Sequence, residues 1–149
     1  IFRDQIVLMV APSNPLARQK TVRVRDIAGQ PLIFPRTGHT RKLLDKMFRP
    51  YRNRLTVSME LASVGMIKRF VAAGLGVSLI SASFAREEER AGEVKLIEIE
   101  GLDAWRELGL IYRRDRTLPR AASAFIELAR MPSAVRGTAA RGAHPAAKS

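Results

Sequence analysis

The sequence predicts a layered α/β fold in which strands alternate with helices. The main observation comes from residues 66–80: apolar residues recur at helical spacing from Met66 to Val71, and Val77–Ile80 follows as a short apolar run. Gly74 and Gly76 separate the two, and glycine permits the backbone conformations that end a helix and approach a neighbour closely. A helix that leads into a buried strand through a glycine turn is typical of a domain with a mostly parallel sheet.

The N-terminal half of the chain adds three strands and a helix. Residues 5–11 form a continuous apolar run, which predicts a strand covered on both faces, and residues 31–34 predict a second strand. From about Thr40 to Arg49 apolar residues line one face at helical spacing, and Pro50 is expected to end this helix. Residues 55–61 are strand-like.

The C-terminal half continues the alternation. Residues 82–90 predict a helix, and residues 94–99 and 107–113 predict two strands. A last helix is expected to begin near Pro119, because a missing N–H costs little in the first turn. Few large apolar residues follow Pro132, so we expect a disordered tail. The expected buried stripe of the last helix consists of Ala122, Phe125, Ile126 and Ala129.

The net charge of +12 raises the question of a nucleic-acid groove. Between Arg36 and Arg54 seven basic residues stand against a single acid, Asp45. Nucleic-acid grooves interleave basic with aromatic residues, and this stretch holds only Phe48 and Tyr51. A solvated helix face is therefore the favoured interpretation.

Several kinds of chemistry are disfavoured by composition. The chain has no cysteine, which excludes disulfides and thiolate chemistry, and no segment approaches the ~20 apolar residues that span a bilayer. The histidines are His39 and His144, so a zinc site built by the protein is not expected. We find no nucleophile–base pair and no phosphate-loop motif, so the chain is not expected to be an enzyme or to hold a cofactor. Trp105 and Tyr112 are expected to be packing residues.

Four segments of the chain resemble the effector-binding domain of LysR-type transcriptional regulators, over roughly residues 4–130. The most specific is residues 63–80, with the turn Val-Ala-Ala-Gly-Leu-Gly-Val. Residues 4–17, 26–33 and 108–120 resemble further steps of the same domain, and the order and spacing of the four segments together carry the resemblance.

The resemblance implies a two-lobed fold like that of the type 2 periplasmic binding proteins. It assigns residues 12–107 to a Rossmann-like second lobe with a mostly parallel sheet. Residues 1–11 and 108–131 would be the remnant of a truncated first lobe, and residues 132–149 the disordered tail. The N-terminal winged helix-turn-helix of the family and part of the first lobe would lie outside this chain.

Independently of the family, the loop of residues 35–41 is the best candidate ligand site. It follows a buried strand and opens a helix, a place where unpaired N–H groups and the positive end of the helix dipole favour an anion. Thr37 and Thr40 add hydroxyl groups, and Gly38 lets the backbone approach a ligand. Alternatively, a threonine merely caps its own helix. Charge is expected from Arg36 or Arg41.

The resemblance favours the ligand interpretation, because Thr37–Gly38 looks like the effector-contacting loop of the family. A second helix start at Ser63 would face the same cleft between the lobes, with the same capping alternative. His39 is either an exposed loop residue or an effector contact. The candidate effector-binding residues are Thr37, Gly38, His39, Thr40 and Ser63.

The resulting functional expectation is an effector-sensing domain of a LysR-type bacterial transcriptional regulator. A small, anionic metabolite would bind between the lobes and control the geometry of a DNA-bound homo-oligomer, a dimer or a tetramer. DNA would be contacted only through the N-terminal domain, the location would be cytoplasmic, and no membrane partner is expected. The alternative is a periplasmic solute-binding protein of a transporter, which could share the fold.

Overall fold

The computed structural model describes residues 2–102, 104–113, 115 and 117–130. The chain divides into two compact units, of which one spans Arg3–Glu107 and the other comprises the rest of the chain. The tail predicted for residues 132–149 lies outside the described residues.

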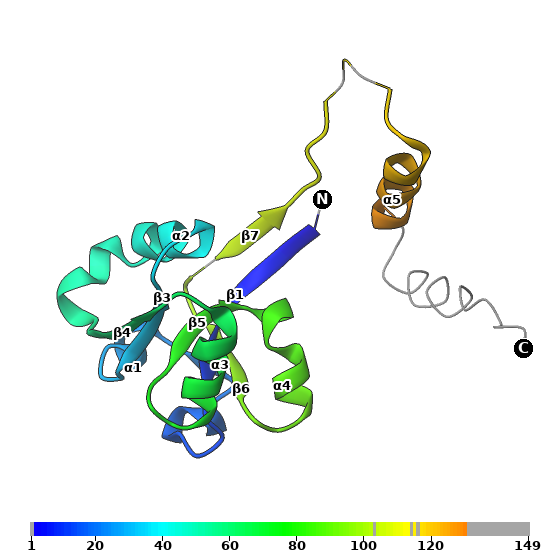
Figure 1. Cartoon of the computed structure of the whole chain (residues 1–149). Coiled ribbons are helices and arrows are strands. Elements are labelled where there is room, and N and C mark those ends of the chain that lie inside the picture. The colour runs from blue at the N-terminus through cyan, green and yellow to red at the C-terminus, as the bar shows by residue number, and fades with distance from the viewer. Residues whose placement is uncertain (1, 103, 114, 116, 131–149) are drawn as a thin grey trace, which may run out of the picture. The chain divides into compact units, whose positions relative to one another are not determined.

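Within the described residues, the strands are short except for the first one, which begins the chain (Figure 1). They are β1 (Phe2–Val10), β2 (Thr21–Val22), β3 (Leu32–Pro35), β4 (Val57–Leu61), β5 (Ser78–Ser81), β6 (Lys95–Ile99) and β7 (Trp105–Leu108).

β1 lies inside a five-stranded sheet of order β2-β6-β1-β5, and β7 also pairs with β1. It runs antiparallel to β5 and β6, with Leu8 opposite both Leu79 and Ile97, whereas β2 is parallel to β6. β3 and β4 form a parallel pair. Backbone hydrogen bonds at Val77 join β3 to the start of β5: Val77 N–H donates to Pro31 O at 2.9 Å, and Ile33 N–H donates to Val77 O at 2.8 Å. The predicted α/β class is confirmed, and the sheet is mixed because β1 opposes its neighbours.

The core lies on both faces of this sheet. Side chains of β1 alternate between two apolar clusters. Leu8 packs with Leu44 of α2 (His39–Met47), and Met9 packs with Ile67 and Val71 of α3 (Val64–Ala72). All of Ile6–Val10 is buried. A strand covered on both faces needs apolar residues at every position, which explains why an unbroken apolar run predicted it.

The helices connect the strands. They are α1 (Val24–Ile27), α2 (His39–Met47), α3 (Val64–Ala72), α4 (Arg86–Arg90) and α5 (Arg120–Arg130), with 3-10 turns η1 (Pro15–Arg18), η2 (Arg49–Arg54) and η3 (Ala82–Phe84). α2 ends at Met47, before Pro50, and the 3-10 turn η2 follows it. Pro50 falls in the first turn of η2, where its missing N–H is tolerated. The helix predicted for residues 82–90 is divided into η3 and α4.

The glycine turn has the two roles that the sequence predicted. Gly74 follows α3 with a φ of 77°, the left-handed conformation that ends helices. Gly76 allows a close approach: a Cβ atom there would lie 2.5 Å from the carbonyl oxygen of Pro31. The junction between β3 and β5 therefore requires glycine at position 76.

Two predictions for the C-terminal segment are wrong. The strand predicted for residues 107–113 occupies Trp105–Leu108 instead, and residues 109–113 have no regular structure, with Ile111 fully exposed. α5 forms where a helix was expected, but none of its residues is buried and Phe125 is 59% exposed. Periodicity reports that a face is apolar, and burial additionally requires another element that packs against that face.

The two aromatic residues expected to pack are partly exposed. Tyr112 is 44% exposed and so is not a core residue. The guanidinium of Arg3 lies 5.8 Å from the ring centre of Trp105, so Trp105 packs against a cation at the surface. No helix within the described part of the chain is long and apolar enough to cross a membrane.

Candidate functional site

The predicted ligand loop connects β3 to α2. β3 ends at Pro35, and Gly38 is the N-cap residue of α2 with a φ of 99° and a ψ of −178°. This conformation is essentially restricted to glycine. No side chain caps α2, so the alternative in which Thr37 or Thr40 caps the helix is wrong.

A second helix start lies close to the first. Ser63 is the N-cap residue of α3, and its hydroxyl group makes no capping hydrogen bond. The first-turn N–H groups of a helix have no acceptor within the helix. Both α2 and α3 therefore present amides that no side chain of the cap satisfies.

The two helix starts contribute to one cavity of about 110 Å³, which we call the loop pocket. Four of the five predicted site residues line it, namely Thr37, Gly38, His39 and Thr40. Ser63 does not line it, although its neighbours Ala62 and Val64 do. The remaining lining residues are Pro35, Ile67, Ser78, Leu79, Ile80 and Phe84.

The apolar back of the loop pocket was missed by sequence reasoning. It comes from β5 and η3, whose Leu79, Ile80 and Phe84 lie about forty residues beyond the predicted loop in the sequence. The only local signal was Ser78, a polar residue in an apolar run. Its hydroxyl donates to Ile33 O at 2.6 Å and so fixes β5 beside β3.

No lysine, arginine, aspartate or glutamate side chain lines the loop pocket. The expected charge from Arg36 or Arg41 is not found there: Arg36 is exposed and does not line the pocket. Arg41 pairs with Asp45 at 2.9 Å and with Glu60. The hydrogen bond to Glu60 and then the one to Asp45 raise the pKa of Arg41 above its usual value. An anion in the loop pocket would therefore be held by backbone amides and hydroxyl groups.

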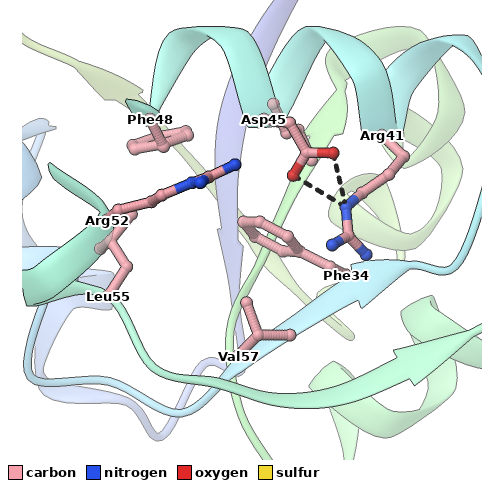
Figure 2. A pocket seen from close by; sticks show the side chains of 8 residues that line it. Phe34, Arg41, Asp45, Phe48, Arg52, Leu55 and Val57 are labelled. Carbon is pink, nitrogen blue, oxygen red and sulfur yellow. Dashed lines mark hydrogen bonds and ion pairs between the residues drawn. The ribbon is translucent and has the colours of Figure 1, made fainter. Parts of the chain in front are cut away.

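A second cavity, of about 300 Å³, lies along α2, and we call it the flank pocket (Figure 2). Its apolar walls come from α2, β3, the segment after η2 and the start of β4. Figure 2 shows Arg41 and Asp45 paired at one side and Arg52 reaching in from the other. Its lining residues are Phe34, Arg41, Leu44, Asp45, Phe48, Arg52, Leu55 and Val57.

Metal binding has no support in the part of the chain that the structure describes. No three histidine or acidic side chains gather there in a way that could hold a metal ion. Asp45, which lines the flank pocket, and Glu60 are engaged instead in ion pairs with Arg41.

Comparisons with known proteins agree with this architecture. The sequence model of a family described as the LysR substrate binding domain matches residues 1–131. CmpR of Synechocystis, an HTH-type transcriptional activator, is 27% identical over 127 residues, which are 85% of this chain and 42% of CmpR. The chain thus spans less than half the length of this curated relative.

Two solved structures show the same fold. The effector-binding domain of QuiR in complex with shikimate matches with a TM-score of 0.67 and 22% identity, over 84% of this chain and 59% of that one. The regulatory domain of CcmR from Synechocystis in complex with 2-PG matches with a TM-score of 0.66 and 21% identity, over 85% of this chain and 61% of that one.

Proposed function

The chain belongs to the LysR substrate binding domain family, and from this premise we propose that it senses a small anionic effector for a bacterial transcriptional regulator. The named relative CmpR is a transcriptional activator, which favours a regulator over the solute-binding protein of a transporter. We propose no catalytic activity.

The observation that carries the proposal is the pair of uncapped helix starts beside one pocket. α2 begins at Gly38 and α3 follows Ser63, and neither start has a side-chain cap. Amides at a helix N-terminus carry a partial positive charge that stabilises an anion. Since no acidic side chain lines the loop pocket, nothing there opposes a carboxylate or phosphate group.

The proposed ligand contacts follow from this arrangement. Thr37 and Thr40 would donate hydroxyl hydrogen bonds to the anion, and the amides after Gly38 would supply the remaining donors. His39 lies at the exposed rim. Ser63 itself does not line the pocket, so the start of α3 would contribute through the amides that follow Ser63. The solved relative QuiR holds shikimate, a carboxylate, which agrees with an acidic effector.

The proposed signal is a change in the arrangement of two lobes. Residues 12–107 would form the second lobe, and residues 1–11 with 108–131 would belong to the first. An effector that binds one arrangement better shifts the equilibrium by that difference in affinity. The shift would alter a homo-oligomer, dimer or tetramer, that contacts DNA through an N-terminal domain outside this sequence, in the cytoplasm.

Calorimetry on the full regulator with a panel of small carboxylates and phosphates, shikimate included, tests the site. Thr37→Ala should weaken binding at least about tenfold, because one hydrogen bond to a charged group is worth about 1.5–3 kcal/mol. The matched control is Thr56→Ala, an exposed threonine that does not line the loop pocket. Undiminished binding by Thr37→Ala would remove Thr37 from the site, and failure of every anion to bind would refute the proposal.

A further inference from the structure

The flank pocket has the form of a small-molecule site. Phe34, Leu44 and Phe48 are almost fully buried and make its floor, whereas Val57 is 39% exposed and lies at its rim. Its volume of about 300 Å³ is at the lower end of the range for pockets that bind small ligands, about 300–1,000 Å³. An apolar body of the size of one aromatic ring fits such a space.

The charged groups of the flank pocket are unequal. Arg41 is already neutralised, because it pairs with both Asp45 and Glu60 and its guanidinium lies 5.8 Å from the ring centre of Phe34. Arg52 has no such partner: no ion pair or hydrogen bond joins its side chain to another residue of the described part of the chain. Figure 2 shows the Arg52 guanidinium directed into the pocket.

We propose that the flank pocket is a second ligand site, separate from the loop pocket, which takes a small carboxylate with an apolar body. The body lies between Phe34, Phe48 and Val57, and the carboxylate pairs with the free guanidinium of Arg52. The local charge favours this pairing, because the stretch from Arg36 to Arg54 contains seven basic residues and one acidic residue, Asp45. Asp45 disfavours a carboxylate at the opposite side, so the ligand has one orientation.

Phenylacetate and its neutral analogue phenylacetamide test this site on the full chain, by calorimetry and by amide chemical shifts. Arg52→Gln should weaken phenylacetate binding about tenfold and leave phenylacetamide within twofold, because only the acid uses the cation. The matched control is Arg49→Gln, an exposed arginine of the same turn that does not line the pocket. Val57→Trp should weaken both compounds at least tenfold, because the indole fills the cavity.

The shifts distinguish this site from the loop pocket. Phenylacetate should shift the amides of Leu44, Phe48 and Leu55 and leave those of Thr37–Thr40 unchanged. Equal binding by Arg52→Gln and Arg49→Gln, shifts confined to Thr37–Thr40, or no saturable binding at millimolar concentration would each overturn the proposal. Sedimentation gives a further outcome that would overturn the proposal. If the parent protein does not bind phenylacetate and Val57→Trp has a lower sedimentation mass than the parent, a second copy of the chain covers the pocket. Of these results, only shifts confined to Thr37–Thr40 bear on the loop pocket, and they would support its proposed role while overturning this one.

Discussion

The two pockets along α2 differ in the source of their donors. No lysine, arginine, aspartate or glutamate lines the loop pocket, whose proposed donors are the backbone amides at two helix starts, whereas the flank pocket contains a free side-chain cation, Arg52, beside a neutralised one. Both are supported by β3, through Pro35 in the first case and Phe34 in the second. We therefore expect side-chain substitutions to abolish ligand binding at the flank pocket, and we expect binding at the loop pocket to be most sensitive to changes of backbone conformation.

A substitution at Gly76, which packs against β3, should give the largest effect and distort both pockets, because β3 contributes to each of them. Gly76→Ala places a Cβ atom 2.5 Å from Pro31 O and 3.0 Å from Ile33 Cγ1, so β3 and β5 must separate. Overpacking of this kind costs about 1–3 kcal/mol, and urea denaturation should show that loss of unfolding free energy. Gly29→Ala is the control, because a Cβ there meets nothing within 4 Å. Equal stability of the two variants would contradict the close approach.

Gly38→Ala should weaken ligand binding at the loop pocket without affecting binding at the flank pocket. A Cβ at position 38 meets no atom within 4 Å, so the penalty comes from the φ of 99° and not from crowding. Such strain costs about 1–3 kcal/mol, and part of it can be relieved by a shift of the first amides of α2. Effector binding at the loop pocket should fall at least tenfold in calorimetry, with phenylacetate binding at the flank pocket unchanged. A loss at both pockets would show that α2 moves as a whole.

Arg41→Gln should affect ligand binding at the flank pocket, unlike Gly38→Ala, which affects the loop pocket. It leaves Asp45 and Glu60 without their shared partner, so the lining becomes more acidic. We expect a loss of about 1 kcal/mol or less in unfolding free energy, since partly exposed ion pairs contribute little, and weaker phenylacetate binding. Arg36→Gln is the matched control. Retained phenylacetate affinity in Arg41→Gln would show that Asp45 does not orient the ligand.

The smallest expected effect concerns the pH dependence of the ion pair between Lys68 of α3 and Glu88 of α4. The hydrogen bond from Lys68 of α3 lowers the pKa of Glu88 below its usual 4.5. Because the folded pKa is the lower one, the contribution of this pair is fully present above about pH 4.5 and is lost as the pH falls through the folded value. Lys68→Met should therefore lower stability slightly at pH 7, and the difference in unfolding free energy between this variant and the parent should be smaller at pH 3. Lys42→Met on α2 should show no such dependence in urea denaturation at the two pH values.

Prediction from the sequence worked where one local pattern determined the environment. Residues 6–10 of β1 are apolar at every position, and all four residues of β5 are buried, because both faces of these strands are covered. Gly74 and Gly76 signalled the turn between α3 and β5. Residues 109–113 have a similar local pattern, but no strand pairs with them and Ile111 is exposed. The pattern could not report the presence of a neighbouring strand.

The candidate site was predicted in the same partial way. The loop around Thr37 was recognisable because a buried strand leads directly into a helix there. Phe84 and Leu79 could not be assigned to its wall, because only the β3–β5 junction brings them near. The destination of Arg41 also depended on a tertiary partner, Glu60, nineteen residues away. Local sequence indicates where donors are available, and chain topology decides what surrounds them.

The missing side-chain caps at Gly38 and Ser63 give the protein a built-in reporter. First-turn amide hydrogens that bond to neither a carbonyl nor a hydroxyl group exchange with deuterium from the solvent without any opening of the fold. An occupant of the loop pocket slows that exchange in the amides following Gly38, whatever its chemical identity. Libraries of unlabelled metabolites can thus be screened by mass spectrometry on one short peptide, with no need to guess the effector first.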